Sequence, residues 1–546
     1  SSTPEFAAAV KALTDTAAVM DNLGKLQEKG KECIKPFGLF LAENGLLPLY
    51  GMPTNIRSLY IGLDRKSKRL LSIDLPAERA IQEFASPQLI TRDKRVYRCQ
   101  GLAPSLYYSE EKRGVQASGQ WYDEFVWIAR CPHCRSHLNL ADVADVSCPL
   151  CGGIVTSGEF HSYAVPNGFV ANFTPVPLRE ADEESFSSQV TDAVLVHHPA
   201  DLRHITSLNL NLGLGTDNTF LFHLNKGPAE KGFCFTEFTG SNRWKTGKQH
   251  VSLPKVAISS ETGAEGGVRR TITGFISRKK TDAAFLAPVS LAKGISLPLP
   301  DESEYNLRTK SIEGAAISAT QILTLRACLE FDIANSEFET LRPKMLLHMP
   351  TIQLADLLPN GSGFCRRLAE ARHAKKPMAA NLLESMIFTP ESDRLVARFI
   401  AKKHKDACRT SCYDCLQQYD NRQFHSILDW RLGISFLRLL TDKDWQVGLD
   451  GNWDFFELED WPSHARSAAE AIRSLLPDRL IVEKAIADTY TIAPIVRNTI
   501  TDKGILIGHP FWTPEDILDR TKTSRCSDVL DSFTALRWPF EALKFL

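Results

Sequence analysis

Hydrophobic positions recur with a helical period in two parts of this 546-residue chain. Near the start, a period of about 3.6 residues is carried by Phe6, Val10, Leu13, Ala17, Met20 and Leu23. Helical patterns return at 315–331, at 392–404 and at 426–440, and another helix is expected from Phe364. We therefore predict a helical segment at the start of the chain and a helix-rich region in its second half.

Between these two parts, apolar and polar residues alternate over short runs bounded by turn residues, which is typical of β-strands. The runs are SLYIGL, KRVYRC, NTFLFHL, GFCFTEF and TITGFIS. We also predict a loop over 261–267 and one continuous strand over Met345–Leu357. The end of the chain mixes strand-like runs such as GILIGHPFW with short helical ones.

Four cysteines in the first third of the chain have the spacing of a zinc ribbon. The pattern is Cys131-x2-Cys134-x13-Cys148-x2-Cys151. Two CxxC turns can wrap one tetrahedral Zn²⁺, and four thiolates leave no open coordination position. We therefore predict a structural zinc site here, with His133 and His137 as bystanders.

A second group of cysteines, Cys408-x3-Cys412-x2-Cys415, needs a fourth ligand to close a zinc site. Cys365 is the preferred choice, because it begins a predicted helix whose positive end favours a thiolate. His404 and His425 are the alternatives. With both groups filled, the chain is expected to bind two zinc ions.

With the zinc sites placed, the patterns predict a multidomain α+β protein. Its predicted parts are a helical entry segment (1–50), a β-rich unit (51–125), a zinc ribbon (126–165), a β-rich domain (166–300), a helical and α/β zinc-binding domain (301–445) and an α/β tail (446–546).

The net charge of −1 shows that the chain as a whole is not a polycation, so any nucleic-acid surface must be local. Basic residues flank the second cysteine group in sequence: Arg366, Arg367, Lys375, Lys376, Lys402, Lys403 and Lys405. If Cys365 and Cys408 shared one ion, these residues would lie together and could follow a phosphate backbone. The amides of the turn 360–363 would either bind a phosphate there or form a plain tight turn.

Several enzyme classes lack their motifs. No GxxxxGK[ST] loop is present, so the chain is not expected to bind ATP itself. The acids Glu457, Glu459 and Asp460 have no lysine at a nuclease-like spacing and are interpreted as a solvated patch, so no catalytic residue is assigned. The chain lacks both an apolar run long enough for a membrane span and a secretory signal, so we expect a cytoplasmic location.

The run CRTSCYDCLQQYDNRQFHSILDWRLG at 408–433 resembles a zinc-binding domain of unknown function found at the C-terminus of many DEAD/DEAH-box (superfamily 2) helicases. NGLLPLYGMPTNIRSLY, RKKTDAAFL and LPNGSGFCRRLAE are similar to the same family in the same order. The likeness is to accessory regions of the MrfA, Druantia DruE and DISARM antiphage type. Trp430 departs from that pattern, because members often have Arg there.

The resemblance implies a non-motor region that binds zinc through Cys365, Cys408, Cys412 and Cys415, guides single-stranded or forked DNA and docks on helicase motor domains. ATP would be bound only by those motor domains, upstream in the chain or in a partner, and other antiviral defence subunits would be further partners. The alternatives are a metal-dependent nuclease with its site in the tail and a scaffold that binds only protein.

Overall fold

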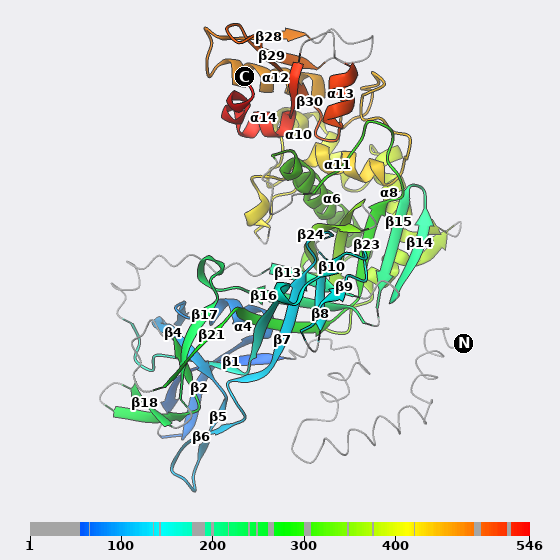
Figure 1. Cartoon of the computed structure of the whole chain (residues 1–546). Helices are drawn as coiled ribbons and strands as arrows, with labels where there is room; N and C mark the ends of the chain where they lie inside the picture. Colours follow the sequence, from blue (N-terminus) through cyan, green and yellow to red (C-terminus); the bar gives the residue numbers. More distant parts are fainter. Residues whose placement is uncertain are drawn as a thin grey trace, which may run out of the picture. The chain divides into compact units, whose positions relative to one another are not determined.

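The computed structural model describes residues 55–546 with internal gaps (Figure 1). The residues outside the description are 1–54, 65, 135, 141–142, 177–191, 198–200, 217, 239–240, 247–248, 260–266, 300–306, 347–348, 374–375, 420, 485–492 and 521–525. The predicted helical segment 1–50, and all of the predicted loop 261–267 except Gly267, therefore lie outside it.

The first sheet has the strand order β2-β1-β12-β4-β20-β17-β21, with β3 paired to β4. Its members are β1 (Ile56–Asp64), β2 (Arg69–Pro76), β3 (Leu89–Arg92), β4 (Arg95–Ala103), β12 (Gly168–Ala171), β17 (Phe233–Glu237), β20 (Ala257–Ser259) and β21 (Val268–Ile272), and the short helix α4 (Ala77–Glu83) follows β2. Strands β1 and β12 run parallel, whereas β12 and β4 run antiparallel. The sheet is therefore mixed.

The second sheet has the order β13-β16-β22-β11-β7-β8. Its members are β7 (Tyr122–Arg130), β8 (His137–Leu140), β11 (Phe160–Pro166), β13 (Asp192–Val196), β16 (Phe220–Asn225) and β22 (Gly274–Lys280). Phe275 of β22 stacks on Phe233 of the first sheet, with ring centroids 4.2 Å apart. Strands from the predicted segments 51–125 and 166–300 share the first sheet, and strands largely from 126–165 and 166–300 share the second, so these segments are interleaved rather than separate in space.

Three two-stranded hairpins accompany these sheets. They are β5 (Ser105–Ser109) with β6 (Gly114–Ser118), β9 (Val146–Ser147) with β10 (Ile154–Val155), and β18 (Ser241–Thr246) with β19 (Gln249–Pro254). The β9–β10 hairpin carries the second CxxC turn of the predicted ribbon. It is followed directly by the short 3₁₀ turn η2 (Ser157–Glu159), which leads into β11.

A third, antiparallel sheet begins the helix-rich half, with the order β14-β15-β23-β25-β24. Its members are β14 (Leu202–Ser207), β15 (Leu210–Gly215), β23 (Ala283–Pro288), β24 (Phe338–Leu346) and β25 (Met349–Asp356). The prediction of one strand over 345–357 is wrong, because Leu346 pairs with Met349 across an antiparallel hairpin. Apolar residues continue through both strands, so hydropathy alone does not reveal the reversal.

Helices α6 (Leu307–Phe331) and α7 (Phe364–Ala369) pack on this third sheet. The other helices of this half are α8 (Met378–Phe388), α9 (Val396–Ile400), α10 (Lys402–Ala407) and α11 (Trp430–Leu439), and the small strands β26 (Ala371–His373) and β27 (Lys376–Pro377) lie between α7 and α8 in sequence. Helix α11 packs closely along α6, where Gly433 is required because a Cβ atom there would lie 2.9 Å from Ser318 Cβ. The helix predicted over 392–404 is two short helices, α9 and α10.

The tail forms a smaller α/β unit. It contains α12 (Trp461–Arg473), β28 (Leu480–Lys484), β29 (Pro494–Asn498), β30 (Gly504–Gly508), α13 (Pro514–Arg520), β31 (Cys526–Asp531) and α14 (Ser532–Arg537), with sheet order β28-β29-β30-β31. One hydrophobic cluster includes Leu440 and Trp512, so the tail and the helix-rich half share a core. The predicted α+β class is confirmed.

Among the helices that the structure describes, none is both long and apolar enough to cross a membrane.

Candidate metal centres

The four ribbon cysteines converge at one point. Ligand atoms of Cys131, Cys134, Cys148 and Cys151 all lie within 4.8 Å of one another. The Sγ atoms of Cys131 and Cys151 are 3.6 Å apart, as are those of Cys134 and Cys148. Zn–S bonds of about 2.3 Å in a tetrahedron place the sulfurs about 3.8 Å apart. The thiols therefore fit one tetrahedral zinc ion.

Local backbone geometry builds this cluster. Strand β7 ends at Arg130, and the amide of Cys131 then donates to the carbonyl of Ser136 at 2.9 Å. The second turn closes with the Gly152 amide donating to the Cys148 carbonyl at 2.8 Å. Gly152 has a φ of +75°, a left-handed conformation that glycine adopts without strain. Backbone hydrogen bonds thus close each CxxC turn.

A buried lysine accompanies the ribbon from another sheet. Lys344 of β24 is 7% exposed, and its Nζ has no hydrogen-bond partner. The amine lies 5.0 Å from the centroid of the Phe285 ring. Burial lowers the pKa of Lys344 to about 7, while the nearby Cys134 and Cys148 act to raise it. A zinc-bound tetrathiolate carries two negative charges, which would offset the cost of this buried cation.

The second centre contains three cysteines and one histidine. His404, Cys408, Cys412 and Cys415 have ligand atoms within 4.8 Å of one another. The Sγ of Cys415 lies 3.8 Å from that of Cys408 and 3.7 Å from that of Cys412. His404 Nε2 lies 3.6 Å from Cys412 Sγ. This donor set matches a Cys₃His zinc site.

Two features prepare the second centre for a cation. His404 Nδ1 lies 2.9 Å from the Phe399 carbonyl, which orients Nε2 toward the thiols as outer-shell partners do in metal sites. A hydrogen bond from Cys408 is the main cause that lowers the pKa of Cys415 to about 5. Helix α10 supplies the histidine one turn before Cys408.

The fourth member of this centre is His404 and not Cys365, which corrects the preferred choice from the sequence. Cys365 is fully buried in α7, and its Sγ lies 3.7 Å from the carbonyl of Leu354 in β25. Burial raises its pKa well above that of an ordinary thiol. The other alternative, His425, has its Nε2 2.9 Å from the Gln418 carbonyl.

The backbone amides at the turn 360–363 and the start of α7 are bound by a carboxylate of the chain itself, that of Asp356. Asp356 accepts hydrogen bonds from the amides of Ser362 at 2.8 Å, Phe364 at 3.1 Å and Cys365 at 2.9 Å. These amides at the start of α7 are therefore used by an internal carboxylate. The turn is a tight structural turn, and nothing supports a phosphate at these amides.

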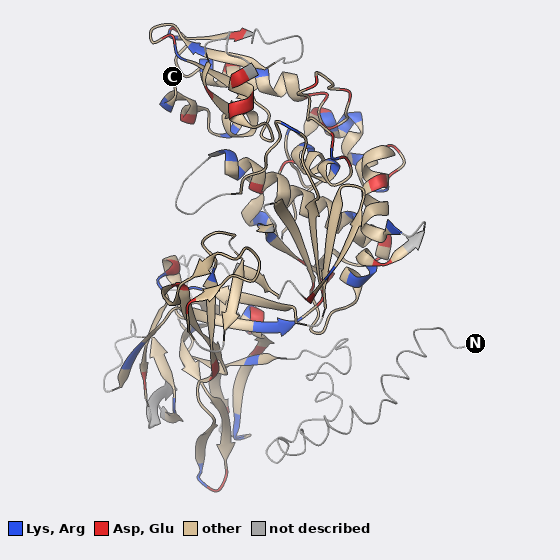
Figure 2. Ribbon diagram, turned by 45° about the vertical axis from the view of Figure 1, so that its right-hand side comes forward, with Lys and Arg blue, Asp and Glu red and all other residues tan. Residues whose placement is uncertain are grey.

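The basic residues that flank the second centre do not form one edge. Arg366 binds Asp282 at 2.7 and 3.0 Å, and Lys376 binds Glu384 at 2.6 Å. Arg367 lies over the Phe331 ring at 4.2 Å. Figure 2 shows Lys and Arg interspersed with Asp and Glu along the described ribbon. The expected gathering fails because Cys365 does not lie with Cys408, Cys412 and Cys415.

The basic residues of α10 differ in their exposure and in their ion pairing. Lys405 pairs with Glu459, and its side chain is 15% exposed. Lys402 and Lys403 are exposed, and in the part of the chain that the structure describes neither has an ion-pair partner. Lys375 lies outside the described residues. Lys402 and Lys403 are the predicted basic residues that stay available to a phosphate backbone.

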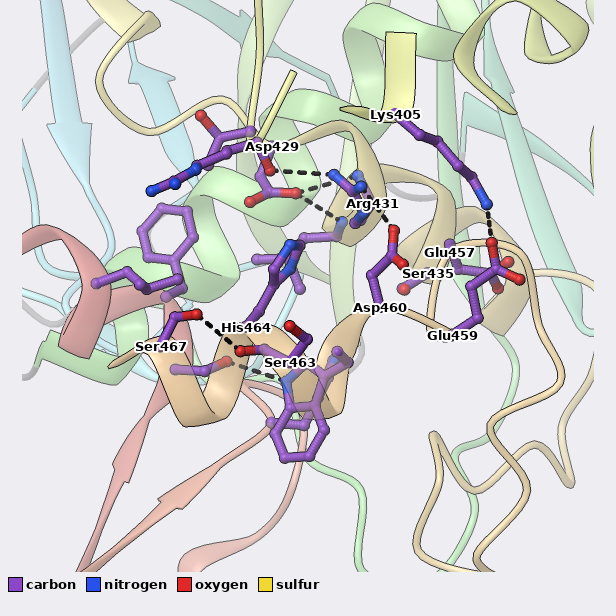
Figure 3. A pocket seen from close by; sticks show the side chains of 18 of the residues that line it. Lys405, Asp429, Arg431, Ser435, Glu457, Glu459, Asp460, Ser463, His464 and Ser467 are labelled. Atoms are coloured by element: carbon purple, nitrogen blue, oxygen red, sulfur yellow. Dashed lines mark hydrogen bonds and ion pairs between the residues drawn. The ribbon is translucent and has the colours of Figure 1, made fainter. Parts of the chain in front are cut away.

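A pocket of about 960 Å³ opens beside the second centre, between α10, α11, α12 and α14 (Figure 3). Its wall holds three acids that the sequence suggested were a solvated patch. Each pairs with a cation: Glu457, which is buried, with Arg438, and Glu459 and Asp460, which are 52% and 40% exposed, with Lys405 and Arg431. The sequence gives no sign of these pairs, because their members come from separate elements.

Arg431 links the pocket to the metal centre. Its guanidinium donates to the carbonyls of Cys408 at 3.2 Å and Arg409 at 3.1 Å, and to Asp460 at 2.9 Å. Asp429 caps α11 by accepting from the amides of Arg431 and Leu432, and burial raises its pKa. The segment that carries the thiols is thus fastened to α11 and to the start of α12.

Comparison with known proteins adds one relative. No protein-family model matches the chain. The chain is similar to the Druantia protein DruE. The alignment with DruE, from Escherichia coli (strain UMEA 4076-1), is 24% identical over 434 residues and covers 73% of this chain. It covers 21% of DruE, so the chain spans about a fifth of that protein's length. This similarity confirms the DruE resemblance that the sequence motifs indicate.

Among solved structures, the chain is loosely similar to the one described as "DUF1998 helicase MrfA bound to DNA". The TM-score is 0.30 at 10% sequence identity, covering 71% of this chain and 34% of that one.

Proposed function

We propose that this chain is a non-motor accessory region of a superfamily 2 helicase that acts in bacterial antiphage defence. It holds two structural zinc ions, contacts single-stranded or forked DNA and docks on motor domains in cis or in trans. The observation that carries this proposal is the similarity to the Druantia protein DruE over 73% of the chain. The two metal centres support it, because that kind of accessory region is expected to contain zinc.

Exposed cations support a role in DNA binding. Lys402 and Lys403 project from the helix that supplies His404, and Arg409 follows the ligand Cys408. A metal at the second centre would hold these cations at fixed positions near one another. Contacts of this kind bind the phosphate backbone without reading sequence, and they weaken as salt rises.

The nuclease alternative gains no support from the described residues. In the described part of the tail, 446–546, no three His, Cys, Asp or Glu side chains lie close enough to hold a metal. Asp531, which lies in that tail, is used to cap α14 and to accept from Ser311 at 2.7 Å. A nuclease site in the tail therefore has no observation in its favour.

A mobility-shift assay with three labelled DNAs tests the proposal. The purified chain should shift a single strand and a fork at low salt more strongly than a blunt duplex, with no ATP required and no cleavage of the label. Failure to shift any of the three, together with tight binding to a motor subunit, would support the scaffold. Metal-dependent cleavage would support the nuclease.

A further inference from the structure

The pocket beside the second metal centre has the features of a ligand site rather than of a gap in packing. It measures about 960 Å³, at the upper end of the range of roughly 300–1,000 Å³ for small-molecule sites. It is lined by residues from the metal-binding segment, from α11, from the start of α12 and from α14. Figure 3 shows Arg431, Asp460, Ser435 and His464 around it.

The interior of the pocket is electrically balanced. Asp460 pairs with Arg431, Glu459 with Lys405, and Arg537 lies 3.9 Å from Asp429. A ligand that entered would meet polar groups of both kinds without an excess of either charge. The body of that ligand must therefore be neutral and able both to donate and to accept hydrogen bonds.

Two buried polar atoms in this wall, Arg431 Nε and Ser435 Oγ, have no hydrogen-bond partner among the described residues. Ser435 of α11 is 1% exposed. A buried hydroxyl without a hydrogen bond costs about 1–3 kcal/mol, so such groups are usually satisfied. A polar ligand in the pocket would provide the missing partner.

The mouth of the pocket carries a net positive charge. Two exposed cations, Lys402 and Arg409, line it together with one exposed carboxylate, Asp406. In the described part of the chain, neither cation has a hydrogen-bond or ion-pair partner, whereas the cations of the interior are paired. An anionic group is therefore favoured at the mouth, outside a neutral polar body.

We propose that this pocket binds a nucleotide, with its phosphate at Lys402 and Arg409 and its base among Arg431, Ser435 and Asp460. Bases present donors and acceptors on one edge, as this wall does, and a phosphate supplies the negative charge. The nucleotide comes either from a DNA strand held at this edge or from solution. The first case deepens the proposed function, while the second does not depend on it.

Zinc binding at the second metal centre would hold the residues of this nucleotide site in position. Lys402 shares α10 with His404, Arg409 adjoins Cys408, and Arg431 binds the carbonyls of both Cys408 and Arg409. Ligation would fix the mouth and one wall together, so removal of zinc from the second centre should remove nucleotide binding.

Isothermal titration of the full chain with deoxynucleoside 5′-monophosphates, inorganic phosphate and a single-stranded 10-mer tests the proposal. Ser467 is an exposed lining residue of α12, so Ser467→Trp should occlude the pocket without disturbing the core. Ser474→Trp is the matched control, because Ser474 is exposed at the end of the same helix and lies outside the pocket. We expect Ser467→Trp to weaken monophosphate binding about tenfold or more and Ser474→Trp to leave it unchanged.

Arg409→Glu should weaken the same binding, while Arg398→Glu, an exposed change on α9, should not. Competition between the 10-mer and the monophosphate would identify the strand as the source, and independent binding would identify the free nucleotide. The proposal is overturned if monophosphates do not bind, if they bind no better than phosphate, or if both Trp variants bind alike. If the 10-mer binds Ser467→Trp as tightly as wild type and monophosphates do not bind, the pocket is not a nucleotide site. The proposed function is unaffected by that result.

Discussion

The guanidinium of Arg431 lies 2.9 Å from the carboxylate of Asp460 and also donates to the carbonyl of Cys408. One side chain thereby connects a metal-ligating segment to the start of α12 in the tail. Arg431 is 6% exposed, so few water molecules could replace these bonds if they were lost.

Replacing Arg431 should loosen the second metal centre. Arg431→Ala removes the two carbonyl bonds and leaves Asp460 unpaired, with an expected loss of about 1–3 kcal/mol in local stability. Zinc release to a chromogenic chelator should become faster for one of the two ions. Arg473→Ala, which removes an exposed pair with Glu470, is the control. Equal release rates for wild type and Arg431→Ala would show that this link does not support the centre.

The identity of the fourth ligand can be tested by elemental analysis. Wild type should contain about two zinc ions per chain, one for each four-residue centre. Cys412→Ser and His404→Ala should reduce the ratio toward one, while His404→Cys should preserve it, because cysteine is also a zinc ligand. Cys365→Ala should keep both ions. A loss of zinc in Cys365→Ala with retention in His404→Ala would reverse this assignment.

Lys344 should affect the pH at which the ribbon releases zinc. Its positive charge beside Cys134 and Cys148 favours thiolates, so its removal raises the pKa of those thiols. Protons then compete with zinc at a higher pH, and acid-driven release from Lys344→Met should begin at a higher pH than in wild type. The exposed change Lys112→Met is the control. Identical release profiles would mean that Lys344 does not act on the ribbon thiols.

The sequence predicts those parts of the sites that depend on local spacing. The ribbon follows directly from two CxxC turns, and both are placed by backbone bonds within the turns. His404 also has a local signal, because it precedes Cys408 by about one helical turn, although the ligand predicted from the sequence is the distant Cys365. The pairing of Arg431 with Asp460 and the burial of Lys344 could not be predicted, because they depend on contacts between elements far apart in sequence.

In the fold too, local features are predictable from the sequence, whereas contacts between distant segments are not. Strand periodicity located β1, β4, β16 and β30 correctly, because alternation is a local property. The partners of these strands are not local. Strand β12 lies between β1 and β4, which places residues from the predicted segment 166–300 inside a sheet begun by 51–125.

DNA binding as a function of salt tests the proposed role most directly. Fluorescence anisotropy with a labelled fork should show affinity that falls linearly on a log–log plot, with a slope of about −0.7 for each phosphate contact to a single strand. Lys402→Glu/Lys403→Glu should weaken binding and flatten that slope, with both zinc ions retained. Lys112→Glu/Arg113→Glu, the same charge change at the exposed β5–β6 turn, should not. If the chain fails to bind the fork at low salt, or if the α10 variant binds like its parent, a DNA-guiding role for this edge is contradicted.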